Sequence, residues 1–151
     1  NDISDVSMLS SLTNLTKLNI GKNRITDISP LASLTNLIYL HIGTNMISEV
    51  GTLAPLSNLA TLYLFENEIN NISTLAPLTS LTTLGAFENN ISDISALASL
   101  TNLHSLYLGG NKVSDISVLA SLTNLKTLHI SGNHISDYTP LDGIPIENLE
   151  T

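Results

Sequence analysis

Residues 59–69 read LATLYLFENEI, and the same pattern of apolar residues returns every 22 residues along the chain. Written with x for any residue, the pattern is L-x-x-L-x-L-x-x-N-x-I. Its second leucine occurs at Leu18, Leu40, Leu62, Leu84, Leu106 and Leu128, and its asparagine at Asn1, Asn23, Asn45, Asn67, Asn89, Asn111 and Asn133. Six units in register cannot arise by chance, so one repeated unit decides the fold.

The first half of each unit predicts a short strand. Leu62 and Leu64 alternate with Tyr63, so the two leucines point inward and the tyrosine points outward. Successive strands are expected to stack into one parallel sheet. Asn67 follows where the chain turns away from the strand, and its amide can both donate and accept hydrogen bonds. We therefore interpret the asparagine column as structural, because stacked amides can satisfy backbone groups that the turn would leave unpaired.

The second half of each unit predicts a 3₁₀ turn. Residues 27–34 read DISPLASL, and the spacing of three between Ile28, Leu31 and Leu34 suits a helix with three residues per turn. An acidic residue precedes the turn in nearly every repeat, and we interpret this column as caps that accept backbone N–H groups. A calcium-binding ladder is the alternative. The column comprises Asp5, Asp27, Glu49, Asp93, Asp115 and Asp137, with Asn71 in the one gap.

Together the two halves form the leucine-rich repeat signature. The run TDISPLASLTNL at residues 26–37 resembles the 22-residue repeat of bacterial internalins and internalin-like surface proteins, and the resemblance covers about residues 1–141. It implies an α/β solenoid of about seven repeats, with a curved parallel β-sheet on the concave face and 3₁₀ turns on the convex face. It also implies that the concave face binds protein receptors on host cells.

We expect a single leucine-rich repeat domain over residues 1–151. The repeats keep register over residues 1–144, and residues 145–151 contain a degenerate last strand, because Ile146 and Leu149 keep the L-x-x-L spacing one residue early. The helical cap and immunoglobulin-like domain that flank internalin repeats are absent from these residues. Solenoids need capped ends for solubility, so we expect flanking caps in a longer protein, with end-to-end association as the alternative.

Composition excludes several classes of function. Five basic against thirteen acidic side chains give a net charge of −8. Binding to nucleic-acid phosphates or to anionic lipid needs clustered Lys and Arg side chains, so both functions are excluded. The chain has no cysteine and no apolar run long enough to be inserted in a membrane. No nucleophile elbow, phosphate loop or H-E-x-x-H motif occurs, so we predict no enzyme activity and no cofactor. His41 and His129 share a column but lie roughly 20 Å apart, so no metal site is predicted.

The outward strand positions carry the candidate binding site. Five of the six aromatic residues occupy three outward columns, where a scaffold needs none for packing. Gly85 is expected to leave a notch between Tyr63 and Tyr107. The alternative is that the two phenylalanines fold over the sheet edge and cover Ala86. The predicted partner-binding residues are Tyr39, His41, Tyr63, Phe65, Phe87, Tyr107 and His129, with Glu66 and Glu88 as an acidic rim.

An apolar centre with a charged rim is the anatomy of a protein interface. We therefore predict a monomeric, non-enzymatic module of a bacterial surface or secreted protein, located extracellularly or at the cell surface. Its concave face would bind a protein, such as a host receptor. One alternative is an intracellular regulatory subunit of a phosphatase-like enzyme. Another is a glycan-binding surface protein, since sugars stack on Tyr and Phe.

Overall fold

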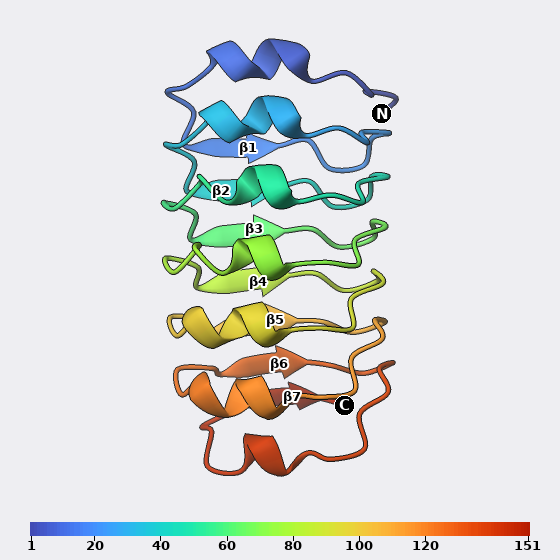
Figure 1. The fold of residues 1–151 in the computed structure, drawn as a ribbon, viewed down its shortest axis with the longest axis vertical. Helices are drawn as coiled ribbons and strands as arrows, with labels where there is room; N and C mark the ends of the chain where they lie inside the picture. The colour runs from blue at the N-terminus through green and yellow to red at the C-terminus, as the bar shows by residue number, and fades with distance from the viewer.

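The computed structural model describes residues 1–151 as a stack of similar coils, each with one short strand and one 3₁₀ helix (Figure 1). The strands are β1 (Lys17–Asn19), β2 (Tyr39–His41), β3 (Thr61–Tyr63), β4 (Thr83–Gly85), β5 (Ser105–Tyr107), β6 (Thr127–His129) and β7 (Asn148–Glu150). The 3₁₀ helices are η1 (Ser7–Ser11), η2 (Ser29–Ser33), η3 (Gly51–Leu53), η4 (Ser73–Leu75), η5 (Ser95–Ser99), η6 (Ser117–Ser121) and η7 (Thr139–Leu141).

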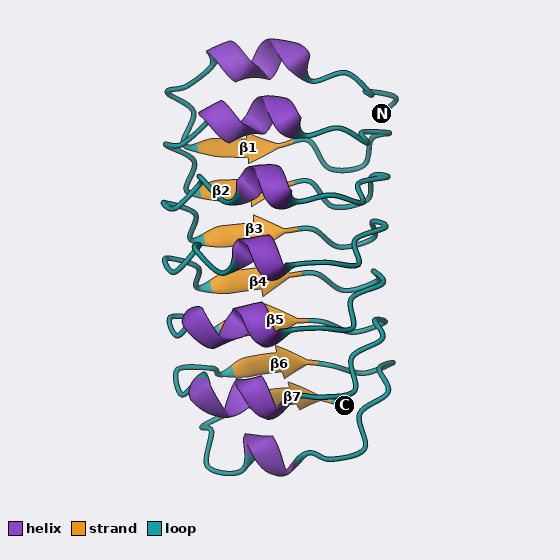
Figure 2. Ribbon diagram, in the orientation of Figure 1, coloured by secondary structure: helices purple, strands orange, loops and turns teal.

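The strands form one parallel seven-stranded sheet in the order β1 to β7, and Figure 2 shows the 3₁₀ helices stacked as a second layer. Each of the first six strands pairs with its neighbour at the period of the sequence, as in the pair of Leu40 with Leu62. The last pairing is shorter by one residue, because Leu128 faces Leu149. The predicted leucine-rich repeat solenoid is thereby confirmed.

A continuous apolar core fills the space between the two layers. It is one cluster of 36 buried residues, to which every strand from β2 to β6 contributes its central leucine. Leu62 and Leu64 are fully buried, whereas Tyr63 between them is only half-buried. The 3₁₀ helices complete the core from the other side, for example with Leu31 in η2. The alternation in the sequence therefore sorts inward from outward side chains as predicted.

The asparagine column ties neighbouring repeats together. The Asn89 side chain accepts the N–H of Ile69 at 3.0 Å and donates to the carbonyl oxygens of Leu64 and Ala86, each at 3.2 Å. Ile69 and Leu64 belong to the preceding repeat, and Ala86 to the same one. Asn45, Asn67, Asn111 and Asn133 make the same set of bonds. Each amide thus satisfies backbone groups that the turn leaves without a partner.

The acid column caps the 3₁₀ turns. Oδ1 of Asp27 accepts the N–H of Ser29 at 2.8 Å, and this hydrogen bond lowers the pKa of the Asp27 carboxyl. The equivalent aspartates make the same bond, and Asn71 makes it at 2.9 Å. These aspartates are Asp5, Asp93, Asp115 and Asp137. Glu49, the remaining member of the predicted column, makes no such bond before η3, because its side chain is one methylene longer than that of aspartate. Since the other six positions make local backbone bonds, the structure favours caps over a calcium ladder, and it contains no group of three or more side chains arranged to hold a metal ion.

Both ends of the core are partly open. Leu18 in β1 is half-buried, whereas Leu84 in the equivalent position of β4 is fully buried. At the other end Leu149 in β7 is 51% exposed.

None of the helices has the length and apolar character needed to cross a bilayer.

Candidate functional site

The predicted binding residues lie on the outward face of the sheet, which we call the sheet face. Tyr39 and His41 come from β2, and Tyr63 from β3. Phe65 and Phe87 lie two residues beyond the ends of β3 and β4, where the chain turns away from the sheet. All five side chains are half-buried, so each ring keeps part of its surface exposed to solvent.

Five of these side chains form a connected set that we call the aromatic cluster: Tyr39, His41, Tyr63, Phe65 and Phe87. The rings of Phe65 and Phe87 are stacked, with centroids 4.6 Å apart and planes 7° from parallel. His41 meets Phe65 edge-on at 5.0 Å, and Tyr63 lies 5.6 Å from His41. Tyr39 meets Tyr63 edge-on at 6.0 Å. The separations and angles are those at which aromatic rings attract one another.

Two small residues make room for the rings of the cluster. A Cβ atom on Gly21 would lie 2.4 Å from the His41 ring, and one on Gly43 would lie 2.8 Å from the Phe65 ring. Both rings therefore lean across the preceding repeat onto bare backbone. Any larger side chain at either glycine would push the ring away.

Tyr63 leans in the opposite direction and covers Gly85. A Cβ atom on Gly85 would lie 2.6 Å from Cδ1 of Tyr63, and Gly85 itself is buried. The notch predicted between Tyr63 and Tyr107 is thus filled by the Tyr63 ring. Sequence spacing placed the three residues in adjacent repeats, but the lean of the tyrosine depends on the empty space that Gly85 leaves.

Burial among the rings changes the acidity of two members of the cluster. Burial lowers the pKa of His41, and the positive charge of Lys22 lowers it further. His41 is therefore neutral at pH 7, and its Nδ1 can accept the N–H of Gly43 at 3.2 Å. Burial also raises the pKa of the Tyr63 hydroxyl. At neutral pH the cluster thus carries no charge of its own.

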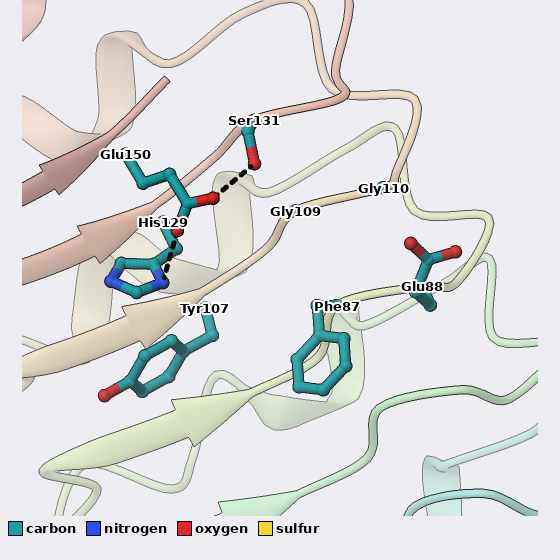
Figure 3. Close-up of a pocket in the computed structure, with 8 residues that line it drawn as sticks. All are labelled: Phe87, Glu88, Tyr107, Gly109, Gly110, His129, Ser131 and Glu150. Carbon is teal, nitrogen blue, oxygen red and sulfur yellow. Dashed lines mark hydrogen bonds and ion pairs between the residues drawn. The ribbon is translucent and has the colours of Figure 1, made fainter.

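Tyr107 and His129 form a separate pair beyond the cluster. Their rings meet edge-on at 4.9 Å, and Nδ1 of His129 lies 3.1 Å from a carboxylate oxygen of Glu150 in β7. A hollow of about 290 Å³ opens between this pair and the end of the aromatic cluster (Figure 3). It is lined by Phe87, Glu88, Tyr107, Gly109, Gly110, His129, Ser131 and Glu150.

The glutamates of the predicted rim differ in their surroundings. Glu66 and Glu88 both adopt left-handed backbone angles, with φ of 51°. The Glu66 carboxylate accepts the hydroxyl of Thr44 at 3.0 Å. Glu88 instead reaches toward Gly110, where a Cβ atom would lie 2.6 Å from its Oε1. Glu66 thus borders the aromatic cluster, while Glu88 borders the hollow.

Sequence reasoning missed part of the hollow. Four residues that line it were not among the predicted binding residues: Gly109, Gly110, Ser131 and Glu150. The glycine pair at 109–110 was the available signal, because two adjacent residues without side chains beside Phe87 leave a depression. Glu150 carried no such signal, since its place depends on the pairing of β7 with β6.

The role of the two phenylalanines has two readings. Ala86 is fully buried, and the stacked rings of Phe65 and Phe87 lie on the turns that flank it. The position of the two rings agrees both with covering Ala86 and with binding a partner. Their half-exposed surface, continuous with His41 and Tyr63, favours the binding role.

Comparisons with known proteins agree with the fold. A family model described as leucine-rich repeats in two copies matches residues 1–33, 13–55, 79–121 and 101–143. No curated protein sequence matches the chain. Among solved structures, a plant receptor-kinase ectodomain from Arabidopsis thaliana shares only the fold, at 21% identity and a TM-score of 0.84.

Bacterial structures are more similar in sequence. The internalin InlF of Listeria monocytogenes is 37% identical with a TM-score of 0.83, and the match covers 99% of this chain and 52% of that one. Internalin C2 of the same organism is 36% identical with a TM-score of 0.81, and the match covers 99% of this chain and 76% of that one. The chain thus spans about half the length of InlF.

The repeat spacing, the parallel sheet with its 3₁₀ layer, the asparagine column and these matches agree with one another. The chain belongs to the leucine-rich repeat proteins of the internalin-like type.

Proposed function

We propose that this domain is a non-enzymatic module of a bacterial surface or secreted protein, and that it binds a protein partner through its concave sheet face. Leucine-rich repeat domains are commonly protein-interaction modules. The proposed contact residues are the aromatic cluster with Glu66, followed by Glu88, Tyr107 and His129. A host-cell receptor is the proposed class of partner, and the proposed location is the cell surface or the extracellular space.

The aromatic cluster is the observation that carries this proposal. Five rings contact one another on a face where the core needs none, and each remains half-exposed. Aromatic side chains supply much contact area at small entropy cost, and they dominate the binding energy of protein interfaces. Single exposed apolar residues are common on any protein, but a contiguous patch of rings with a polar border marks an interaction site.

Two features support the bacterial, exported assignment. The similar structures InlF and C2 are named internalins of Listeria monocytogenes, and they match the chain over 99% of its length. The surface is rich in Ser, Thr and Asn, and the chain has five Lys and Arg residues in all. Both features fit an internalin-like surface protein better than a phosphatase regulator inside the cell.

A binding screen with matched variants tests the proposal. The panel contains host-cell ectodomains, phosphatase catalytic subunits and cell-wall glycans, each applied to the wild-type domain and to the double variant Phe65→Ala/Phe87→Ala. We expect an ectodomain to bind the wild type, and its affinity to fall at least about 100-fold in the variant, as for two hot-spot residues.

The control is the double variant Ile38→Ala/Met46→Ala. Both residues are large, apolar and exposed, at 48% and 42%, but neither belongs to the aromatic cluster. This variant should bind like the wild type. A partner that loses affinity equally in both double variants does not use the cluster, and a panel in which only glycans bind would replace the protein-binding proposal with a carbohydrate-binding one.

A further inference from the structure

The hollow beside the aromatic cluster has a chemistry of its own. Its floor is the backbone of residues 109–110, and Phe87 and Tyr107 form aromatic walls. Two carboxylates, of Glu88 and Glu150, border the same space (Figure 3). None of the five Lys and Arg side chains of the protein lines it. The hollow therefore combines rings with negative charge, whereas the aromatic cluster is uncharged.

Glu88 has no partner within the protein. Its carboxylate extends toward Gly110, which has no side chain to receive it, and no hydrogen bond or ion pair reaches either oxygen. The equivalent carboxylate one repeat earlier, that of Glu66, is satisfied by the hydroxyl of Thr44 at 3.0 Å. The repeat that surrounds Glu88 thus differs from its neighbour in leaving a negative charge available at the rim of a cavity.

Glu150 is engaged only in part. One of its oxygens lies 3.1 Å from Nδ1 of His129, an ion pair that exists only when the imidazole is protonated. The other accepts the hydroxyl of Ser131 at 3.5 Å, a long and weak hydrogen bond. Each carboxylate oxygen can accept two hydrogen bonds, so Glu150 keeps acceptor capacity toward the hollow.

We propose that this hollow binds one arginine side chain of the partner protein. The guanidinium would donate to Glu88 and Glu150, while its planar face lies against the ring of Phe87 or Tyr107. Arginine suits the site better than lysine, because its flat, weakly hydrated fork pairs with carboxylates and stacks on aromatic rings at once. The inference rests on the proposed function, since a protein partner supplies the arginine.

The size of the hollow fits a side chain better than a free small molecule. Its volume of about 290 Å³ lies just below the usual range of ligand pockets, which run from roughly 300 to 1,000 Å³. The net charge of −8 also attracts a positively charged partner toward the protein as a whole. An arginine here would add specificity at one end of the interface that the aromatic cluster begins.

The hollow can be tested without the partner, using N-acetyl-L-arginine amide as the probe. The probe is titrated into the ¹⁵N-labelled domain, and the backbone amide resonances of Gly109 and Gly110 are followed. The chain has only eight glycines, so these signals are readily resolved. We expect saturable shifts at both residues and none at Gly51, which lies in η3 on the other layer.

Neutral analogues separate charge from shape. N-acetyl-L-citrulline amide has nearly the same form as the arginine probe but no charge, and it should produce no saturable shift. The lysine analogue should bind more weakly than arginine. Equal binding of citrulline and arginine would overturn the proposal, and so would saturation by a neutral disaccharide in place of arginine, which would mark the hollow as a sugar site.

A matched pair of variants locates the interaction. Glu88→Gln removes the unpaired charge while keeping the size of the side chain, and we expect the arginine probe to bind about three- to fivefold more weakly, as for the loss of one exposed charge pair. Glu68→Gln removes an equal charge from an exposed position outside the hollow and should change nothing. Equal effects of the two variants would reduce the binding to net charge and contradict the site.

This experiment and the screen fail independently. If the probe binds as described but no protein partner is found, the preference of the hollow for arginine is confirmed, but the proposed function and the assignment of the arginine to a partner protein fail. If a partner requires Phe65 and Phe87 but the probe does not bind, the proposed function stands and the arginine site is wrong.

Discussion

Single residues in this protein act mainly on the neighbouring repeat. Asn89 bonds across the boundary between two coils, and Gly43 carries the Phe65 ring of the next one. A substitution at either position should therefore perturb the neighbouring coil, 20 to 25 residues away in the sequence. An exposed residue next to such a position, which makes no contact with the neighbouring coil, is therefore a suitable control.

The first prediction concerns Asn89, whose side chain is 8% exposed. Asn89→Ala leaves the N–H of Ile69 without a partner, and one unsatisfied buried group costs about 1–3 kcal/mol. The carbonyl groups of Leu64 and Ala86 lose one donor each but keep the side chains of Asn67 and Asn111. We expect the free energy of unfolding to fall by roughly 1–3 kcal/mol in urea denaturation. Asn90→Ala, at the exposed neighbouring position, should change it by less than about 0.5 kcal/mol. Similar losses of stability in the two variants would contradict the stabilising role of the asparagine column.

The second prediction concerns Gly43. In Gly43→Ala the added methyl group would lie 2.8 Å from the Phe65 ring, so the ring must move. Because the ring edge is free to swing toward solvent, we expect a stability loss of at most about 1 kcal/mol, at the low end for overpacking. The ring resonances of Phe65 should shift, and partner affinity should fall. Gly51→Ala is the control, since its methyl group would meet only Thr74 at 3.8 Å.

At the scale of the element, each 3₁₀ turn depends on a cap that precedes it. Five of the seven turns begin beside an aspartate whose carboxylate accepts a backbone N–H, and one beside Asn71. Every one of those carboxylates has a lowered pKa, because the hydrogen bond favours the charged form. The turns are thus linked to pH through a repeated local contact.

The third prediction is the pH dependence of stability that follows. Since the folded pKa lies below the ordinary value near 3.8, the stabilisation by Asp27 is fully present above that value and is lost as the pH falls through the lowered pKa. We expect the melting temperature to fall below about pH 4. Asp27→Asn keeps an acceptor but cannot titrate, so its curve should be shallower.

Asp142→Asn provides the control for this series. The Asp142 side chain is exposed and accepts no hydrogen bond, so its replacement should leave the pH profile of the wild type unchanged. If Asp27→Asn and Asp142→Asn give the same curve, local capping is not the source of acid sensitivity.

At the scale of the whole molecule, the core is continuous but its ends are open. All 36 buried apolar residues form one cluster, and the repeats contact only their neighbours. In such a solenoid the interior coils are supported from two sides and the terminal coils from one. Stability should therefore decrease from the middle toward both ends.

The fourth prediction compares two leucines of one column. Leu84→Ala in β4 empties a fully buried position and should cost about 2–5 kcal/mol. Leu18→Ala in β1 is half-buried and should cost less than half as much. Hydrogen exchange of the wild type should likewise show the amides of β1 and β7 opening before those of β4. Equal costs for the two leucines would indicate that the ends are as well supported as the middle.

The sequence by itself determined the repeat, the parallel sheet, the inward leucines and the outward rings. The reason is physical: a strand has a period of two, a 3₁₀ turn has a period of three, and a strict period of 22 residues superposes each on its counterpart in the next coil. The same logic identified the asparagine and acid columns as structural, because their spacing placed them at turns and caps.

Tertiary structure alone decided how the outward side chains are arranged. Tyr63 covers Gly85, while Phe65 leans the other way over Gly43, because each ring moves toward the side on which a glycine leaves space. Glu150 stands beside His129 because β7 pairs with β6 at an interval of 21 residues, one short of the repeat period. These contacts depend on which neighbouring repeat has a glycine beside the ring and on the register of β7 with β6. Neither follows from the period of the sequence.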